Sequence, residues 1–283
     1  KAMEKSKLFK TFIILVLTFV FLYLFLENNQ ATEVTQVSAL TDVTGYAVYD
    51  GRNVYEHYKS ILSEKEKIVY DELKEAYLQF KPSFSTTVEE IKSEELKRVF
   101  SAVILDHPEI FWIDSYSSMG DIFTGNVYTS MVIHLRYTFS KEEALQIKQQ
   151  IESKYSEIIQ GAKRYKSDKK RVKYVHDKLI EISEYTGYTN EQRDKFQSII
   201  SIFETGDTVC AGYSYGFKFI MDNLGIESIA VENINNKDSS KSHIWNKVKL
   251  DGVWYNLDVT WDSQLSKDSN ISYKYYLLDN NEF

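Results

Sequence analysis

The chain has 283 residues, of which 43 % are hydrophobic and 14 % aromatic, and it carries a formal net charge of −7. This length and apolar content allow a sizeable core, and they exclude a disordered or low-complexity chain. One cysteine excludes an internal disulfide and a cysteine-based metal cluster, and beyond residue 26 only 30 basic side chains stand against 40 acidic ones, so we expect no nucleic-acid partner.

An apolar segment lies near the start of the sequence. Residues 11–26 read TFIILVLTFVFLYLFL, lysines precede them, and Glu27 follows. At about 1.5 Å per residue, this run is near the lower limit for crossing a ~30 Å hydrocarbon core, and no small-residue cleavage pattern follows it. We therefore expect a basic cytoplasmic stub at 1–10, a single-pass transmembrane signal anchor at 11–27, and the rest of the chain outside the cell. The alternative is a secreted protein whose signal is cleaved.

The region up to residue 165 shows the patterns of a mixed α+β domain. A polar tether is expected over 28–50, and a domain over 51–165. Capping boxes at Ser63 and Ser140 mark the start of two helices. The predicted elements are a strand at 46–49, helices at 63–80 and 93–105, a strand at 131–139 and a helix at 140–159.

The single cysteine stands at the start of a predicted helix. A helix is expected over 167–185, and a second one runs from Cys210 to the stop signal at Gly225. In the first turn of a helix, unpaired backbone N–H groups and the positive end of the dipole favour a thiolate. A lone cysteine is more often a small core side chain, so its position rather than its type indicates chemistry.

Asp251-Gly252 is flanked by two runs, 243–250 and 253–260, in which residues of two kinds alternate between the faces of a strand. This is the pattern of a β-hairpin with a two-residue turn. With strands that continue to residue 260, His243 lies opposite Thr260. Asp258 is then a diagonal neighbour of His243 on the same face, within side-chain reach. The other face is apolar except for Asn246, and this contrast sets the register.

The order thiol, imidazole, carboxylate matches the needs of a thiol enzyme. Such an enzyme uses a nucleophile, a base and a third group that orients the base, and we predict these roles for Cys210, His243 and Asp258. An oxyanion donor is also required, and the backbone N–H of Cys210 and the side chain of Gln197 are the candidates. The alternative for Gln197 is an ordinary surface position.

The segments TVCAGYSYGFKFIMDNLGI, SHIWN and WYNLDVTWD resemble the transglutaminase-like superfamily over residues 168–262. The resemblance implies a papain-like α+β core over 166–283, in which a catalytic helix packs on an antiparallel sheet, and it assigns the triad roles to the same three residues. It also implies that Tyr213, Trp245 and Trp261 lie at the substrate-site rim. LDHPEIFWID, over 105–114, resembles bacterial surface members, which implies a bacterial cell-surface protein.

The resemblance implies acyl transfer between extracellular proteins or peptides. A glutamine side chain forms a thioester with Cys210 and is passed to a lysine or another amine. A cysteine peptidase or amidase with the same triad stays open as an alternative, and so does a non-catalytic surface binding module. We expect no cofactor and no metal, because the other histidines lack ligand spacing and the sequence shows no EF-hand loop.

Overall fold

A computed structural model describes residues 46–49, 52–114, 122–124, 127–130, 132–233, 242–267 and 270–283. All of these residues belong to one compact unit, which spans 41–283. The predicted transmembrane segment 11–27 therefore lies outside the described residues. Among the helices of the described ranges, none has the length and apolar character that a membrane span requires. The expected domain boundary at residue 165 stays a prediction.

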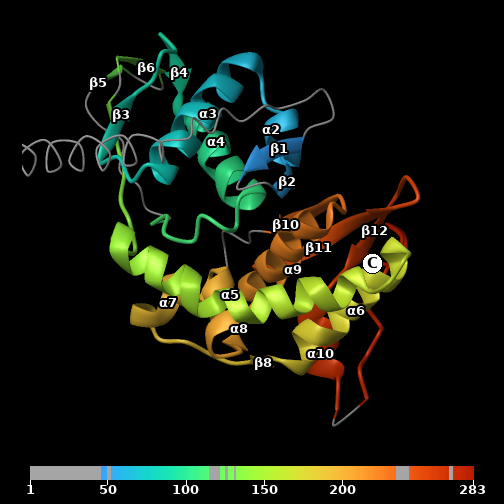
Figure 1. The fold of residues 1–283 in the computed structure, drawn as a ribbon. Coiled ribbons are helices and arrows are strands. Elements are labelled where there is room, and N and C mark those ends of the chain that lie inside the picture. The colour runs from blue at the N-terminus through green and yellow to red at the C-terminus, as the bar shows by residue number, and fades with distance from the viewer. Residues whose placement is uncertain are drawn as a thin grey trace, which may run out of the picture. The chain divides into compact units, whose positions relative to one another are not determined.

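The described chain alternates helices with short strands (Figure 1). The helices are α2 (His57–Ser60), α3 (Glu64–Leu78), α4 (Ser93–Asp106), α5 (Lys141–Lys163), α6 (Asp168–Glu181), the 3-10 helix η1 (Asn190–Gln192), α7 (Arg193–Phe196), α8 (Ile199–Glu204), α9 (Cys210–Leu224) and α10 (Val259–Leu265). The strands are β1 (Tyr46–Tyr49), β2 (Arg52–Tyr55), β3 (Ser83–Ser85), β4 (Ile91–Lys92), β5 (Ile122–Thr124), β6 (Val127–Ser130), β7 (Val132–His134), β8 (Glu184–Tyr185), β9 (Asp207–Thr208), β10 (Ser228–Asn233), β11 (His243–Leu250) and β12 (Val253–Leu257).

Helix α9 is the centre of the second half of the fold. It packs on the antiparallel sheet β10-β11-β12, in which β11 is the middle strand. Helices α5, α6 and α8 also pack against α9 (Figure 1). Twelve of its residues are buried, so the start of α9 is held by packing on several sides.

The helices predicted before residue 165 are confirmed. Both capping boxes are present, and α3 and α5 begin directly after Ser63 and Ser140. The strand predicted over 131–139 is shorter, because regular pairing stops at His134 and only an isolated bridge joins Tyr137 to Ile113.

The predicted hairpin forms in the predicted register. Leu250 lies opposite Val253, and the pairs continue in step along β11 and β12. Asp251 and Gly252 have φ values of 51° and 82°, the left-handed conformation that such a turn needs at both positions. Val253 belongs to the apolar face of the hairpin but is 52 % exposed, because it lies beside the turn at the end of the sheet.

The expected continuation of the second strand to residue 260 is wrong. β12 ends at Leu257, and Asp258 is the N-cap of α10, with its Oδ1 accepting the N–H of Trp261 at 3.0 Å. Asp is a favoured N-cap residue, and this local hydrogen bond overrides the strand preference of the following Val-Thr pair. His243 therefore pairs with Asn233 of β10, and no strand residue faces it from the β12 side.

Candidate thiol site

Cys210 is the first residue of α9 and is partly exposed. It follows β9, which pairs in parallel with β8, so the chain enters the helix from a short fixed strand. The N-cap residue Val209 provides no side-chain hydrogen bond. The first N–H groups of α9 therefore have no capping side chain from the N-cap residue, which makes this end of the helix suited to negative charge.

The side chains of His243 and Asp258 form a close pair. Nε2 of His243 lies 2.5 Å from Oδ2 of Asp258, and the carboxylate is completely buried. Cys210 also raises the pKa of this imidazole, so the thiol lies close to the ring. The structure thus brings the three predicted residues together.

The charge state of His243 follows from these contacts. Partial burial of the ring lowers its pKa, but the hydrogen bonds to Asp258 and Cys210 outweigh burial and raise the pKa from the usual 6.5 to about 9. His243 is therefore an imidazolium at neutral pH, and an adjacent imidazolium stabilises a thiolate.

Aromatic rings surround the imidazole. The indole of Trp261 stacks face to face on His243, with centroids 4.6 Å apart and an angle of 4° between the planes. Trp245 lies on the same strand with its centroid 6.2 Å from the imidazole, and Phe283 contacts both indoles. The two predicted rim tryptophans therefore lie beside the site and restrict the orientation of the ring.

Two hydrogen bonds fix the thiol helix to the histidine strand. The hydroxyl of Ser214, one turn after Cys210, donates to the carbonyl of Ile244 at 2.9 Å. The amide of Asn246 donates to the carbonyl of Ser214 at 3.0 Å, and Asn246 is 1 % exposed. Asn246, the polar interruption of the apolar face, thus holds α9 on β11 near Cys210 and His243.

The other two predicted site residues lie differently. Tyr213 is fully buried, and its hydroxyl contacts the hydroxyl of Ser263 at 2.8 Å, so it braces α9 against α10 instead of lining a rim. Gln197 is exposed at the end of α7, and its amide donates to the hydroxyl of Tyr188 at 2.9 Å. A role for Gln197 as oxyanion donor stays a prediction.

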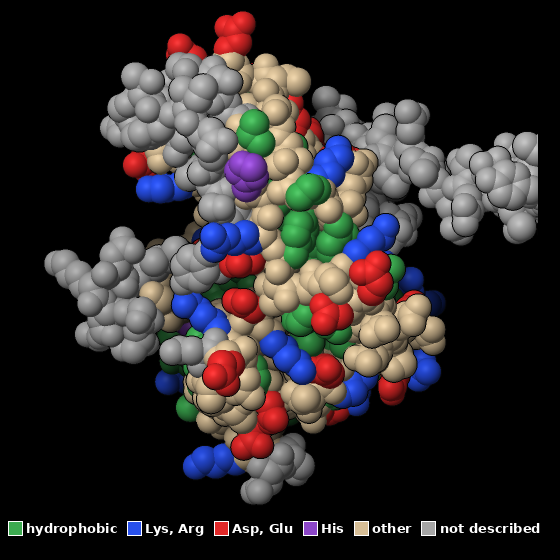
Figure 2. All heavy atoms as spheres, turned by 90° about the vertical axis from the view of Figure 1, so that its left-hand side faces the viewer, with side chains coloured by type: hydrophobic (Ala, Val, Ile, Leu, Met, Phe, Trp, Pro, Cys, Tyr) green, Lys and Arg blue, Asp and Glu red, His purple; other side chains and the backbone are tan. Residues whose placement is uncertain are grey.

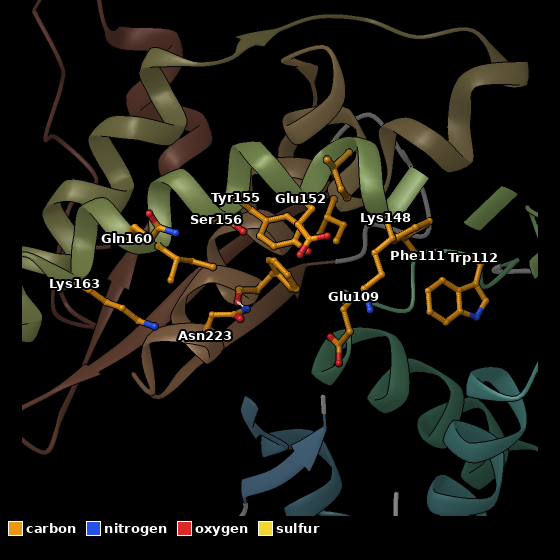
Figure 3. Close-up of a pocket in the computed structure, with 14 residues that line it drawn as sticks. Glu109, Phe111, Trp112, Lys148, Glu152, Tyr155, Ser156, Gln160, Lys163 and Asn223 are labelled. Carbon is orange, nitrogen blue, oxygen red and sulfur yellow. Dashed lines mark hydrogen bonds between the residues drawn. The ribbon is translucent and has the colours of Figure 1, made fainter. Parts of the chain in front are cut away.

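A cavity of about 400 Å³ lies elsewhere, between α5 and residues 109–112 (Figure 3). Its lining includes Tyr155 of α5 together with Phe219 and Asn223 of α9. Phe219 is nine residues after Cys210, or about 14 Å along the helix axis. None of the three clustered residues lines this cavity, so it is separate from the thiol site.

One pair of buried side chains near the site was not predicted. His176 of α6 and Asp262 of α10 are both fully buried and lie 3.2 Å apart at Nε2 and Oδ2. The available sequence signal is a histidine beside Val172, Val175 and Leu179 on the apolar stripe of a helix, a pattern that does not by itself indicate a partner.

Among the described side chains we find neither a metal-binding cluster nor, on the face seen in Figure 2, a basic surface. Within the described ranges, no group of three or more His, Cys, Asp or Glu side chains could hold a metal ion. Figure 2 shows basic and acidic side chains interspersed on one face of the molecule, so this face has no broad basic surface.

Residues 155–259 match the family model described as the transglutaminase-like superfamily. The predicted resemblance to this superfamily is therefore confirmed over a region that contains Cys210, His243 and Asp258. The α+β fold, with the thiol helix packed on an antiparallel sheet, agrees with this assignment.

Solved structures similar to this chain include one described as a TGase, with 15 % sequence identity and a TM-score of 0.36, covering 60 % of this chain and 48 % of that chain. Another is the periplasmic domain of TgpA from Pseudomonas aeruginosa bound to ethylmercury, with 13 % identity, a TM-score of 0.29, and coverage of 51 % and 65 %. A second structure of the TgpA domain has 11 % identity, a TM-score of 0.30, and coverage of 51 % and 62 %. The chain thus spans less than two thirds of each structure. No curated protein matches the sequence.

Proposed function

We propose that this chain is a thiol acyltransferase of the protein-glutamine gamma-glutamyltransferase type. Cys210 is the nucleophile, His243 the general acid and base, and Asp258 the group that orients the imidazole. The observation that carries the proposal is the imidazole of His243, which lies 2.5 Å from the Asp258 carboxylate and close enough to Cys210, at the start of α9, for the thiol to raise its pKa. A nucleophile paired with an oriented base is the arrangement that covalent catalysis needs.

The first step forms a thioester. The Cys210 thiolate attacks the carboxamide carbon of a glutamine side chain and makes a C–S bond. As the C–N bond breaks, the His243 imidazolium gives its proton to the departing nitrogen, and ammonia leaves. The backbone N–H of Cys210 is the proposed donor to the carbonyl oxygen, and Gln197 is the second candidate.

The second step transfers the acyl group. An amine, such as a lysine side chain, attacks the thioester carbon while the neutral imidazole of His243 accepts a proton from the attacking nitrogen. The C–S bond breaks, an isopeptide bond remains, and the thiolate and imidazolium are restored. Water in place of the amine gives the hydrolase reaction, and the indoles of Trp245 and Trp261 beside His243 support the transferase by limiting water access.

The thiolate and imidazolium pair can be tested by alkylation. Cys210 is the only cysteine, so a thiol-specific reagent reports on this residue alone. We expect alkylation at pH 6 to be at least about tenfold faster in the wild-type chain than in His243→Ala, because the imidazolium stabilises the thiolate. His134→Ala is the control, since His134 is exposed on β7. Equal rates in the three proteins would contradict the proposed pair.

The reaction type is tested by incubating the wild-type chain and Cys210→Ala with a glutamine-containing protein and a labelled primary amine. Label in the protein, released ammonia, and loss of both in Cys210→Ala support the transferase. Cleavage or deamidation without label supports the peptidase or amidase alternative. No reaction, together with a thiol that resists alkylation, supports a non-catalytic binding module.

We also propose that the domain acts outside a bacterial cell on extracellular proteins or peptides, anchored by residues 11–27. The support is the sequence itself, in which lysines precede this apolar run and Glu27 follows it. Protease added to intact cells should remove the domain from the membrane fraction. A domain protected until the cells are lysed would contradict the proposed orientation.

A further inference from the structure

The buried pair His176 and Asp262 is not used in the proposed reaction. Nε2 of His176 lies 3.2 Å from Oδ2 of Asp262, and both side chains are fully buried. Nδ1 of His176 lies 3.0 Å from Asp177, and the ring packs on Tyr273 and Tyr276. Burying such a pair costs free energy unless every polar atom of both side chains has a hydrogen-bond partner. The other hydrogen bonds of Asp262 therefore show which segments the pair joins.

The second oxygen of the Asp262 carboxylate binds the segment that follows α10. Oδ1 accepts the hydroxyl of Ser272 at 2.8 Å and the N–H of Tyr275 at 3.0 Å. One carboxylate therefore joins three parts of the chain: α6 through His176, its own helix α10, and residues 272–275.

The segment bound by the Asp262 carboxylate also contacts Asp258 and Trp261 of the candidate site. The carbonyl of Tyr275 accepts the N–H of Asp258 at 2.9 Å, and the N–H of Asp262 donates to the carbonyl of Asp258 at 3.1 Å. The ring of Tyr275 packs edge-on against Trp261, with centroids 4.8 Å apart. The N–H of Asp258 is thus held by Tyr275, which the Asp262 carboxylate binds, and the ring of Tyr275 packs on the indole that stacks on His243.

We propose that His176 and Asp262 are positioning residues that set the place of Asp258 and Trp261 against the imidazole of His243. This inference rests on the proposed function. The pair touches no reacting atom, and it acts through the backbone of Asp258 and through Tyr275. A bond of 2.5 Å between His243 and Asp258 depends strongly on geometry, so a small displacement of α10 weakens it.

The test is an NMR pH titration of His243 in the 283-residue chain, with kinetics measured beside it. The chain has five histidines, so one substitution identifies each signal. In the wild type we expect His243 to titrate near pH 9. In Asp262→Asn we expect the midpoint to fall by about one pH unit, because the bond to Asp258 weakens. We expect kcat to fall about ten- to 100-fold with little change in KM.

A matched control separates positioning from general stability. Glu109→Gln also removes a carboxylate from a buried histidine, since Glu109 lies 2.9 Å from Nδ1 of His107. Glu109 lines the cavity near the far end of α9 (Figure 3). We expect this variant to lose stability while His243 still titrates near pH 9. Ser272→Ala, which removes one hydrogen bond from Asp262, serves as a milder variant and should lower the midpoint in the same direction.

The outcomes separate the two proposals. Folded Asp262→Asn and Ser272→Ala chains in which His243 titrates as in the wild type would overturn the positioning role, whatever their activity. If Asp262→Asn does not fold, Ser272→Ala alone decides. If the wild type shows no acyl transfer or hydrolysis, the proposed function fails, while a lowered His243 midpoint in the variants still supports positioning.

Discussion

Asp258 combines three structural roles in one residue. Its Oδ1 caps α10 through the N–H of Trp261, its Oδ2 bonds to His243, and its own N–H donates to the carbonyl of Tyr275. The Asp258 carboxylate is therefore already oriented by its other hydrogen bonds. Little conformational freedom of this side chain is lost in the pair with His243.

Asp258→Asn tests the role of this carboxylate. An amide can still cap α10, but it cannot stabilise the imidazolium as a carboxylate does, so the pKa of His243 should fall from about 9 toward 6.5. We expect kcat/KM to fall about 10²- to 10⁴-fold, and the alkaline limb of the pH profile to move to lower pH. A pH profile of the wild type and the variant measures both effects. An unchanged alkaline limb would show that this limb does not arise from deprotonation of His243.

At the scale of elements, two glycines let α9 approach α8. A Cβ at Gly212 would lie 1.9 Å from Oγ1 of Thr208 and 2.4 Å from Oγ of Ser201, two hydroxyls that are hydrogen-bonded to each other at 2.6 Å. A Cβ at Gly216 would meet Cγ2 of Ile202 at 2.9 Å. The first contact disrupts a buried hydrogen bond, and the second only crowds a methyl group.

These contacts predict different costs for the same change. Gly212→Ala should lower the free energy of unfolding by about 1–3 kcal/mol, because overpacking outweighs the better helix propensity of alanine. Gly216→Ala should change it by less than about 1 kcal/mol, since a small shift of Ile202 relieves the contact. Urea unfolding of both variants measures the difference. Equal stability of the two would contradict this account of the helix contact.

A buried ion pair on α9 fastens β2 to the same helix. Nζ of Lys218 lies 2.7 Å from Oδ2 of Asp222, and Lys218 is fully buried. Lys218 also donates to the carbonyl of Tyr55, and the N–H of Tyr55 lies 3.4 Å from Asp222. The pair thus holds the end of β2 on the helix that begins with the thiol.

Breaking this pair should cost more than replacing it. Lys218→Met leaves the Asp222 carboxylate buried without its cation, and we expect a loss of about 3–5 kcal/mol in the free energy of unfolding. Lys218→Met combined with Asp222→Leu should lose less, because no charge stays buried. A double-mutant cycle in urea measures the coupling. Additive losses would show that the two side chains do not depend on each other.

At the scale of the whole molecule, buried histidines make stability depend on pH. Both ring nitrogens of His107 face carboxylates, with Glu56 and Glu109 each 2.9 Å away. Burial lowers the pKa of His107, but the carboxylates outweigh burial and raise it to about 9. The imidazolium is therefore part of the folded core.

The sign of the effect follows from the raised pKa. The stabilisation by His107 is complete below pH 6.5, the value for the unfolded chain, and it is lost as pH rises through 9. We expect the free energy of unfolding to fall by on the order of 3 kcal/mol between pH 6 and pH 10 from this residue alone. Urea unfolding across this range should show a shallower decline in His107→Gln. Equal declines in the two proteins would contradict the buried imidazolium.

The elements that could be predicted are those whose signals are contiguous. The capping boxes at Ser63 and Ser140, the helix from Cys210 to Gly225 and the turn at Asp251-Gly252 each depend on a few neighbouring residues, whose hydrogen bonds form locally. The approach of His243 to Asp258 was also predicted, although from two strands instead of a strand and a helix N-cap.

Contacts between distant segments that lie outside these motifs could not be predicted. His176 and Asp262 are 86 positions apart, so their pairing exists only after α6 and α10 have packed together. The burial of Tyr213 and the cavity beside α5 likewise depend on which surfaces meet.

The sequence by itself therefore determined the thiol at a helix start, the hairpin that carries the histidine, and the resemblance of this region to the transglutaminase-like superfamily. Only the tertiary structure decided that Asp258 caps a helix, that Trp261 stacks on His243, and that the buried carboxylate of Asp262 binds Tyr275, which contacts both Asp258 and Trp261. The physical reason is that local hydrogen bonds select a backbone conformation within a few residues, whereas side-chain burial is a property of surfaces that the whole chain brings together.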